Sequence, residues 1–161
     1  FDAAQLPVFL LGENREELGG SEWLACRRGV EAGHPPVVDL DHEARLAQLL
    51  AAGVAAGTVV SAHDVSDGGL GVALAECCIT SPAGTGVRVT LADRIRPDAL
   101  LFGESTGRVI VTTRNAGALR VLAEQHRIPC TQIGETGGER FTVGAAEGEV
   151  WLDLEVEQLR S

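Results

Sequence analysis

The sequence predicts an α/β or α+β domain built around a mixed β-sheet. Two observations indicate this class: GRVIVTT at 107–113 has the composition of a strand, whereas 116–126 repeats apolar residues with helical spacing. A third is that glycine and proline separate such segments at short intervals, with no internal repeat. Because 161 residues suffice for one sizeable hydrophobic core, we expect a single domain over residues 1–161.

The first part of the chain is expected to alternate between strand and helix. LPVFLLG at 6–12 is continuously apolar, as a buried strand would be. Ser21 is a suitable cap for a helix to about Gly29, and Asp39 or Asp41 for a second helix that ends at Gly57. The expected apolar stripe of this second helix consists of Ala44, Leu46, Leu49, Leu50 and Val54. A short strand is expected at 58–62.

The rest of the chain continues this alternation. GVRVTL at 86–91 alternates apolar and polar residues, which indicates a strand with one buried face. The other expected strands cover 107–113 and regions near 129–134, 139–143 and 149–152. The expected helices cover about 69–80, 97–101 and 116–126, with a short helix closing the chain.

Composition narrows the classes of function. The net charge of −10 disfavours a long nucleic acid as a partner. All 13 basic residues are arginine, which excludes Schiff-base chemistry and a P-loop lysine. No apolar run approaches the length of a membrane span and no signal peptide is recognisable, so we expect a cytoplasmic protein without a membrane partner. Because the chain starts at Phe1 and contains no methionine, we interpret it as a piece of a longer protein or as a chain that has lost its front end.

The cysteines do not predict a metal site. They are Cys26, Cys77, Cys78 and Cys130, with no CxxC pair and no histidine at ligand spacing. We interpret them as small hydrophobic residues in a reducing compartment. No metal ligand is therefore assigned in this chain.

The stretch SAHDVSDGGLGVALAECC at 61–78 carries the candidate site. Its second half is a helix with one apolar face, and Ser66 or Asp67 is the expected N-cap. Gly68 and Gly69 then stand where backbone N–H groups have no intrahelical acceptor, and glycine costs a helix about 1 kcal/mol relative to alanine. Such a pair indicates a close approach to the backbone, for which phosphate is the usual ligand.

The acids at this helix start leave two interpretations open. Asp64 and Asp67 would repel a bare phosphate, but they suit one that arrives with magnesium. Alternatively, the acids cap and the glycines turn the chain, and close helix–strand packing explains the rest. His63 is expected to be structural, because neighbours on a strand point to opposite faces.

Two other places in the sequence also allow both a functional and a structural interpretation. Gly19, Gly20 and Ser21 form a second glycine-bearing helix start, which is either another backbone cradle at the same cleft or a capped turn. Glu104 lies between apolar residues and a strand, so its carboxylate must be paired, and Arg108 is a candidate partner. A structural role for Glu104 is favoured over catalysis.

Several of these segments resemble the phosphoribosylformylglycinamidine synthase family of glutamine-dependent amidotransferases. They occur in the family's order and span nearly the whole chain: VFLLGENREELGGSEW (8–23), SAHDVSDGGLGVALAE (61–76), LFGESTGRVIVTT (101–113), IPCTQIGETGGERFTV (128–143) and LDLEVEQLRS (152–161). Each motif is weak alone and specific in combination. The resemblance implies the last domain of a multidomain enzyme, with a three-layer α/β/α sandwich of partial ferredoxin-like topology like the C-terminal domain of aminoimidazole ribonucleotide synthetase.

The resemblance also implies an ATP-dependent carbon–nitrogen ligase of purine biosynthesis. The family converts formylglycinamide ribonucleotide, ATP and glutamine-derived ammonia to formylglycinamidine ribonucleotide, ADP and phosphate. ATP and Mg2+ would serve the intact enzyme, with none expected to bind tightly to this domain alone. Its partners would be the N-terminal domains, a glutaminase and small accessory subunits, and nucleotide substrates.

The family's main catalytic and substrate-binding motifs belong to earlier domains and do not occur here. No catalytic residue is therefore assigned, and the isolated domain is expected to be inactive. The residues that match the loop of an auxiliary nucleotide cleft are Gly19, Gly20, Ser21, Asp64, Ser66, Asp67, Gly68 and Gly69. An exposed apolar face is expected where an upstream domain would dock.

Two alternatives come from other classes. The chain could belong to a sister enzyme, such as aminoimidazole ribonucleotide synthetase, thiamine monophosphate kinase or selenophosphate synthetase, which the upstream sequence would distinguish. It could also be a non-catalytic binding module, in which case the isolated chain would bind ATP–Mg2+ with micromolar affinity.

Overall fold

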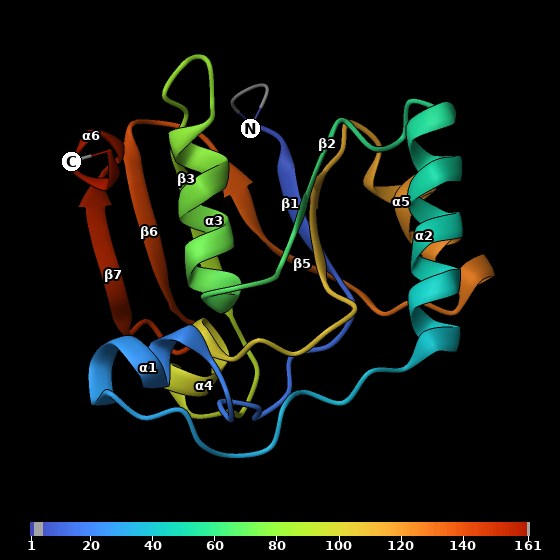
Figure 1. Ribbon diagram of the computed structural model, residues 1–161. Coiled ribbons are helices and arrows are strands. Elements are labelled where there is room, and N and C mark those ends of the chain that lie inside the picture. The colour runs from blue at the N-terminus through green and yellow to red at the C-terminus, as the bar shows by residue number, and fades with distance from the viewer. Residues whose placement is uncertain (2–4, 161) are drawn as a thin grey trace.

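The computed structural model describes residues 1 and 5–160 and shows one mixed β-sheet with helices on both faces (Figure 1). The order across the sheet is β2-β4-β1-β5-β3-β6-β7. The pairs of neighbouring strands are antiparallel except β3 and β6, which are parallel. The strands are β1 (Pro7–Leu11), β2 (Ser61–Asp64), β3 (Val87–Leu91), β4 (Val109–Thr112), β5 (Cys130–Thr136), β6 (Arg140–Ala145) and β7 (Val150–Glu155). The mixed-sheet prediction is thus confirmed.

The expected helices all form. They are α1 (Glu22–Arg28), α2 (Leu40–Ala55), α3 (Gly69–Ile79), α4 (Pro97–Phe102), α5 (Ala116–His126) and α6 (Val156–Leu159). Ser21 caps α1 by accepting a hydrogen bond from the Leu24 amide, and Asp39 caps α2 by accepting one from the His42 amide. None of the helices in the described part of the chain is long and apolar enough to cross a membrane.

The sheet separates two hydrophobic cores, and β1 contributes to both. Val8 and Leu10 pack with α3 on one face, whereas Phe9 and Leu11 pack with α2 and α5 on the other. The continuous apolar run of β1 therefore reflects burial on both faces. This part of the molecule has the three layers that the family resemblance implies.

Two local predictions at α2 are wrong. Val54 is 60 % exposed and Ala44 is also exposed, so the buried face of α2 is narrower than the predicted stripe. The strand expected from residue 58 begins at Ser61 instead. The amides of Thr58 and Val59 both donate to the Gly53 carbonyl and close the end of the helix, which leaves them unable to pair in the sheet.

Candidate functional site

The loop that joins β2 to α3 holds most of the predicted site residues. It enters α3 at the end of the helix that lies near α1 and α4 (Figure 1). Asp64, Ser66 and Asp67 are exposed, whereas Gly68 and Gly69 are buried. Within the described residues, none of the three exposed side chains makes a hydrogen bond, so all three remain available to a ligand.

The expected N-cap of α3 is wrong. The cap residue is Gly68, whose φ of 81° lies in the left-handed region, and no side chain caps the helix. The Gly69 amide donates instead to the Ser66 carbonyl at 3.0 Å. The helix begins at Gly69, as expected, but the Ser66 and Asp67 side chains stand outside it without capping it.

Glu104 provides the anion that the start of α3 receives. Its Oε1 atom accepts hydrogen bonds from the Gly68 amide at 2.8 Å and from the Glu22 amide at 2.9 Å. The expected pairing of Glu104 with Arg108 is wrong, because two backbone amides satisfy the carboxylate. A charged acceptor is favoured here because N-terminal amides carry partial positive charge. The Gly68 amide therefore has an internal partner in place of an external phosphate.

The two predicted glycine-bearing helix starts come together at this carboxylate. Glu22 is the first residue of α1 and directly follows Gly19, Gly20 and Ser21. Ser21 is buried, and its hydroxyl donates to the Leu18 carbonyl at 2.7 Å. A Cβ on Gly19 would lie 2.3 Å from the His34 carbonyl oxygen, so close packing accounts for that glycine.

Gly69 also has an explanation within the fold. A Cβ at this position would lie 2.6 Å from the Gly103 carbonyl oxygen and 2.8 Å from the Phe102 carbonyl carbon. The start of α3 thus rests directly on the backbone at the end of α4. The loop therefore offers a ligand its acidic and hydroxyl side chains, since packing and Glu104 occupy its glycine backbone.

Arg108 lies inside the same end of the molecule and is 1 % exposed. Its Nε donates to the Ser105 carbonyl at 2.8 Å, and its Nη2 donates to the Gly103 carbonyl at 2.7 Å. Burial lowers the pKa of Arg108 to about 10, while Glu17 and Asp64 act in the opposite direction. The site therefore has a buried positive charge beneath its acidic loop.

The remaining residues that the sequence singled out have structural surroundings. The Nε2 atom of His63 lies 3.4 Å from a Glu76 carboxylate oxygen, in agreement with a structural role. Trp23 stacks on Phe102 with ring centroids 6.2 Å apart, and the Trp151 side chain packs against the core on the α3 face. Burial raises the pKa of Cys77 to about 11 and that of Cys78 to about 12, which makes both thiols unreactive at neutral pH.

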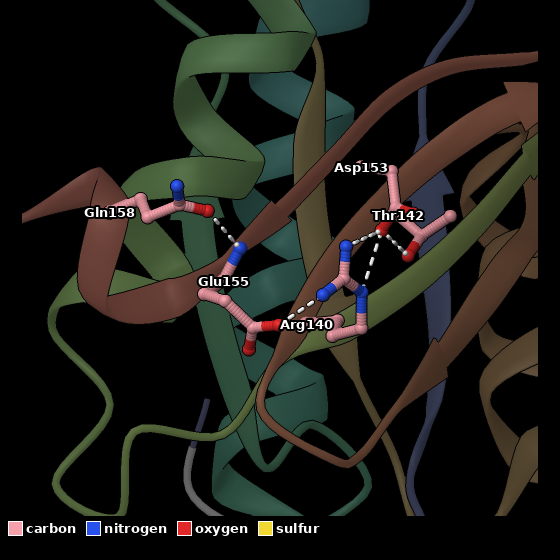
Figure 2. Close-up of polar contacts among 5 residues, drawn as sticks. All are labelled: Arg140, Thr142, Asp153, Glu155 and Gln158. Carbon is pink, nitrogen blue, oxygen red and sulfur yellow. Dashed lines mark hydrogen bonds and ion pairs between the residues drawn. The ribbon is translucent and has the colours of Figure 1, made fainter.

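A hollow of about 1270 Å³ lies elsewhere, over the face of β5, β3 and β6 that α3 does not cover. Arg140, beside it, donates to Asp153 and Glu155 of β7, and Thr142 also donates to Asp153 (Figure 2). The carboxylates already occupy the guanidinium of Arg140. We therefore interpret this face as a solvated, ion-paired surface.

The fold and the loop motif agree with one known family. Residues 6–145 match the family of the AIR synthase related protein, C-terminal domain, and the chain belongs to this family. It is 48 % identical over 143 residues to the phosphoribosylformylglycinamidine synthase subunit PurL of Thermomicrobium roseum, covering 85 % of this chain and 19 % of the relative. It is 45 % identical over 157 residues to the subunit PurL of Thermobifida fusca, covering 95 % of this chain and 20 % of the relative. The chain thus spans about a fifth of the length of these curated relatives.

Solved structures share the fold at lower sequence identity. Thermotoga maritima PurL complexed with FGAR matches with a TM-score of 0.78 and 20 % identity, covering 98 % of this chain and 28 % of that one. The same protein complexed with ATP matches with a TM-score of 0.77 and 19 % identity, covering 99 % of this chain and 26 % of that one. At this sequence identity the matches establish the shared fold, and the bound ATP and FGAR are ligands of the Thermotoga maritima protein.

Proposed function

We propose that this chain forms the C-terminal part of a phosphoribosylformylglycinamidine synthase. The supporting observation is identity of 45–48 % to PurL subunits over most of the chain, together with the family match over residues 6–145. The enzyme would join ammonia from glutamine to formylglycinamide ribonucleotide, with release of ADP and phosphate from ATP. It would work in the cytoplasm with a glutaminase and small accessory subunits as partners.

In this proposal the chain contributes one wall of an auxiliary nucleotide cleft. Asp64 and Asp67 are exposed, neither forms an ion pair with another described residue, and carboxylates of this kind are ligands that Mg2+ prefers. The amide of Gly68 is occupied by Glu104, so the fit is to a metal-bound phosphate through carboxylate oxygens. Residues 1 and 5–160 contain no group of three or more side chains that could together hold a metal ion. Other parts of the enzyme would therefore complete the site.

An exposed apolar stretch supports docking of an upstream domain near this loop. Val37, Val38 and Leu40 are 64 %, 56 % and 77 % exposed. The Thr106 hydroxyl donates to the Val37 carbonyl at 3.0 Å, so the stretch is fixed beside the loop that carries Glu104. Apolar residues gathered in this way are typical of a surface that a partner covers.

The test is amidine formation by the full-length enzyme with ammonia, ATP and Mg2+. The double variant Asp64→Asn, Asp67→Asn is expected to lose at least about tenfold in kcat/KM or in binding of ATP–Mg2+, because both charged ligands are removed. The variant Asp41→Asn on the exposed start of α2 serves as the control. Absence of amidine formation by the unmodified full-length enzyme would reject the proposal.

A second measurement distinguishes this proposal from a self-contained binding module. The isolated 161-residue chain is expected to bind ATP–Mg2+ weakly or not at all in calorimetry, because its wall of the cleft is incomplete. Micromolar binding by the isolated chain would favour the module.

A further inference from the structure

We infer that Glu104 is a positioning residue that sets where the start of α3 and the start of α1 lie relative to each other. This inference rests on the proposed function, because loop 64–69 is the segment assigned to the nucleotide cleft. Glu104 contacts no reacting group in this role. It acts through the backbone of the loop that presents Asp64 and Asp67.

The geometry of the two hydrogen bonds carries the inference. A single oxygen, Oε1 of Glu104, accepts from the Gly68 amide at 2.8 Å and from the Glu22 amide at 2.9 Å. Both amides stand at helix N-termini, where no intrahelical acceptor is available. Hydrogen bonds to a charged acceptor are about twice as strong as neutral ones. One oxygen atom thereby joins two helix starts that lie 36 and 82 residues from Glu104 in the sequence.

Helix α1 has few other attachments. None of its seven residues is buried, so it lacks the apolar face that holds most helices to a core. In the part of the chain that the structure describes, its other anchors include the stack of Trp23 on Phe102 and the buried Ser21 before its first turn. Loss of the carboxylate would therefore weaken the attachment of the start of α1 to the rest of the domain.

Hydrogen bonds hold the backbone of Glu104 and of the residues that flank it in the chain. Its amide donates to the Glu17 carbonyl at 3.2 Å. The carbonyls on either side of it, of Gly103 and Ser105, both accept hydrogen bonds from the buried Arg108. Three residues after Glu104, the carbonyl oxygen of Gly107 lies 2.8 Å from Nε2 of His42. A side chain supported in this way transmits a defined position to the two helix starts.

The test compares Glu104→Ala with Glu104→Gln, because glutamine keeps an acceptor oxygen in the same place. Glu124→Ala, an exposed glutamate on α5 at the opposite face, is the matched control. Amide hydrogen exchange of the 161-residue chain is measured at Gly68 and Glu22, with the amide of Val111 in the centre of β4 as the internal reference for folding. Amidine formation is measured separately in the full-length enzyme.

The expected result is exchange at Gly68 and Glu22 that is about ten- to a hundredfold faster in Glu104→Ala. Exchange at Val111 is expected to stay slow in all variants, Glu104→Gln is expected to lie between Glu104→Ala and the unmodified chain because its acceptor is neutral, and Glu124→Ala is expected to stay close to the unmodified chain. In the full-length enzyme, Glu104→Ala is expected to lower kcat/KM about tenfold or more, with partial recovery in Glu104→Gln.

Unchanged exchange at Gly68 and Glu22 in Glu104→Ala would overturn the inference. Faster exchange with unchanged kinetics would also overturn it, because the loop would then be held by Glu104 without mattering to the reaction. An unmodified full-length enzyme that forms no amidine would reject the proposed function instead, and the exchange result would still judge whether Glu104 sets the two helix starts.

Discussion

Arg108 donates from Nη1 to Oδ1 of Asn14 over 2.9 Å, although 94 positions separate the two residues in the sequence. The same guanidinium holds the carbonyls of Gly103 and Ser105. One buried cation thus joins the loop after β1 to the loop before β4. Within the described residues, no carboxylate lies within ion-pair distance of Arg108, so these neutral acceptors are its direct partners, while the more distant carboxylates of Glu17 and Asp64 also stabilise its charge.

Replacing Arg108 tests this arrangement. Arg108→Met keeps most of the side-chain volume but leaves three oxygen atoms without their donors inside the protein. We expect a loss of about 2–4 kcal/mol in the free energy of unfolding, measured by urea denaturation of the chain. Arg114→Met, at an exposed arginine just after β4, is expected to stay within about 0.5 kcal/mol of the unmodified chain. Equal effects from the two variants would contradict a structural role for Arg108.

Gly69 and Gly117 both lie in the first turn of a helix, but only Gly69 is packed directly against another backbone segment. Gly69→Ala puts a Cβ 2.6 Å from the Gly103 carbonyl oxygen, at a φ of 72° that disfavours a side chain, so we expect a loss of about 2–4 kcal/mol. Gly117 lies in the first turn of α5, where a Cβ would lie 3.5 Å from Asn115 Oδ1, an ordinary van der Waals contact. Gly117→Ala is therefore expected to be neutral or to stabilise by up to about 1 kcal/mol. Thermal or urea unfolding measures both, and a stable Gly69→Ala chain would show that α3 does not rest on α4 as described.

Because two thiols are buried, we expect the free energy of unfolding to decrease at alkaline pH. The pKa of Cys77 is raised to about 11 and that of Cys78 to about 12 in the folded chain, whereas unfolded thiols titrate near pH 8.5. The folded state therefore retains protons that the unfolded state releases, and stability falls as pH rises above about 8.5.

The measurement is the free energy of unfolding at pH 8 and pH 10 under reducing conditions. We expect a decrease of about 2–4 kcal/mol between these values. The double variant Cys77→Ala, Cys78→Ala should lose most of this dependence, whereas Cys26→Ala, at an exposed thiol, should keep it. A pH dependence that is the same in all three chains would rule out the two buried thiols as its source.

Local chemistry explains why much of the fold could be predicted. The limits of α1 follow from Ser21 before it and Gly29 after it, both of which cap the helix as expected. The helix at 116–126 has the predicted bounds because Asn115 caps it and its apolar residues repeat with helical spacing. These signals act between residues a few positions apart, so the sequence displays them directly.

The errors occur where distant segments compete with local signals. Ser66 and Asp67 are good caps by composition, yet the carboxylate of Glu104 takes the Gly68 amide and the helix begins after it. Arg108 is close to Glu104 in the sequence, yet its donors point to Asn14 and to two loop carbonyls. Spacing along the chain contains no information on which of these acceptors the folded backbone brings nearest.

The α/β class, the order of strands and helices, and the family motif around Asp64 and Asp67 follow directly from the sequence. Periodicity, caps and turn residues are local properties, and they are sufficient for those conclusions. In contrast, it is the three-dimensional arrangement of distant segments that makes Gly68 and Glu22 share one carboxylate oxygen and places a buried guanidinium behind the loop. Buried amides and charges need hydrogen-bond partners once water is excluded, and the folded path of the chain determines which partners lie within reach.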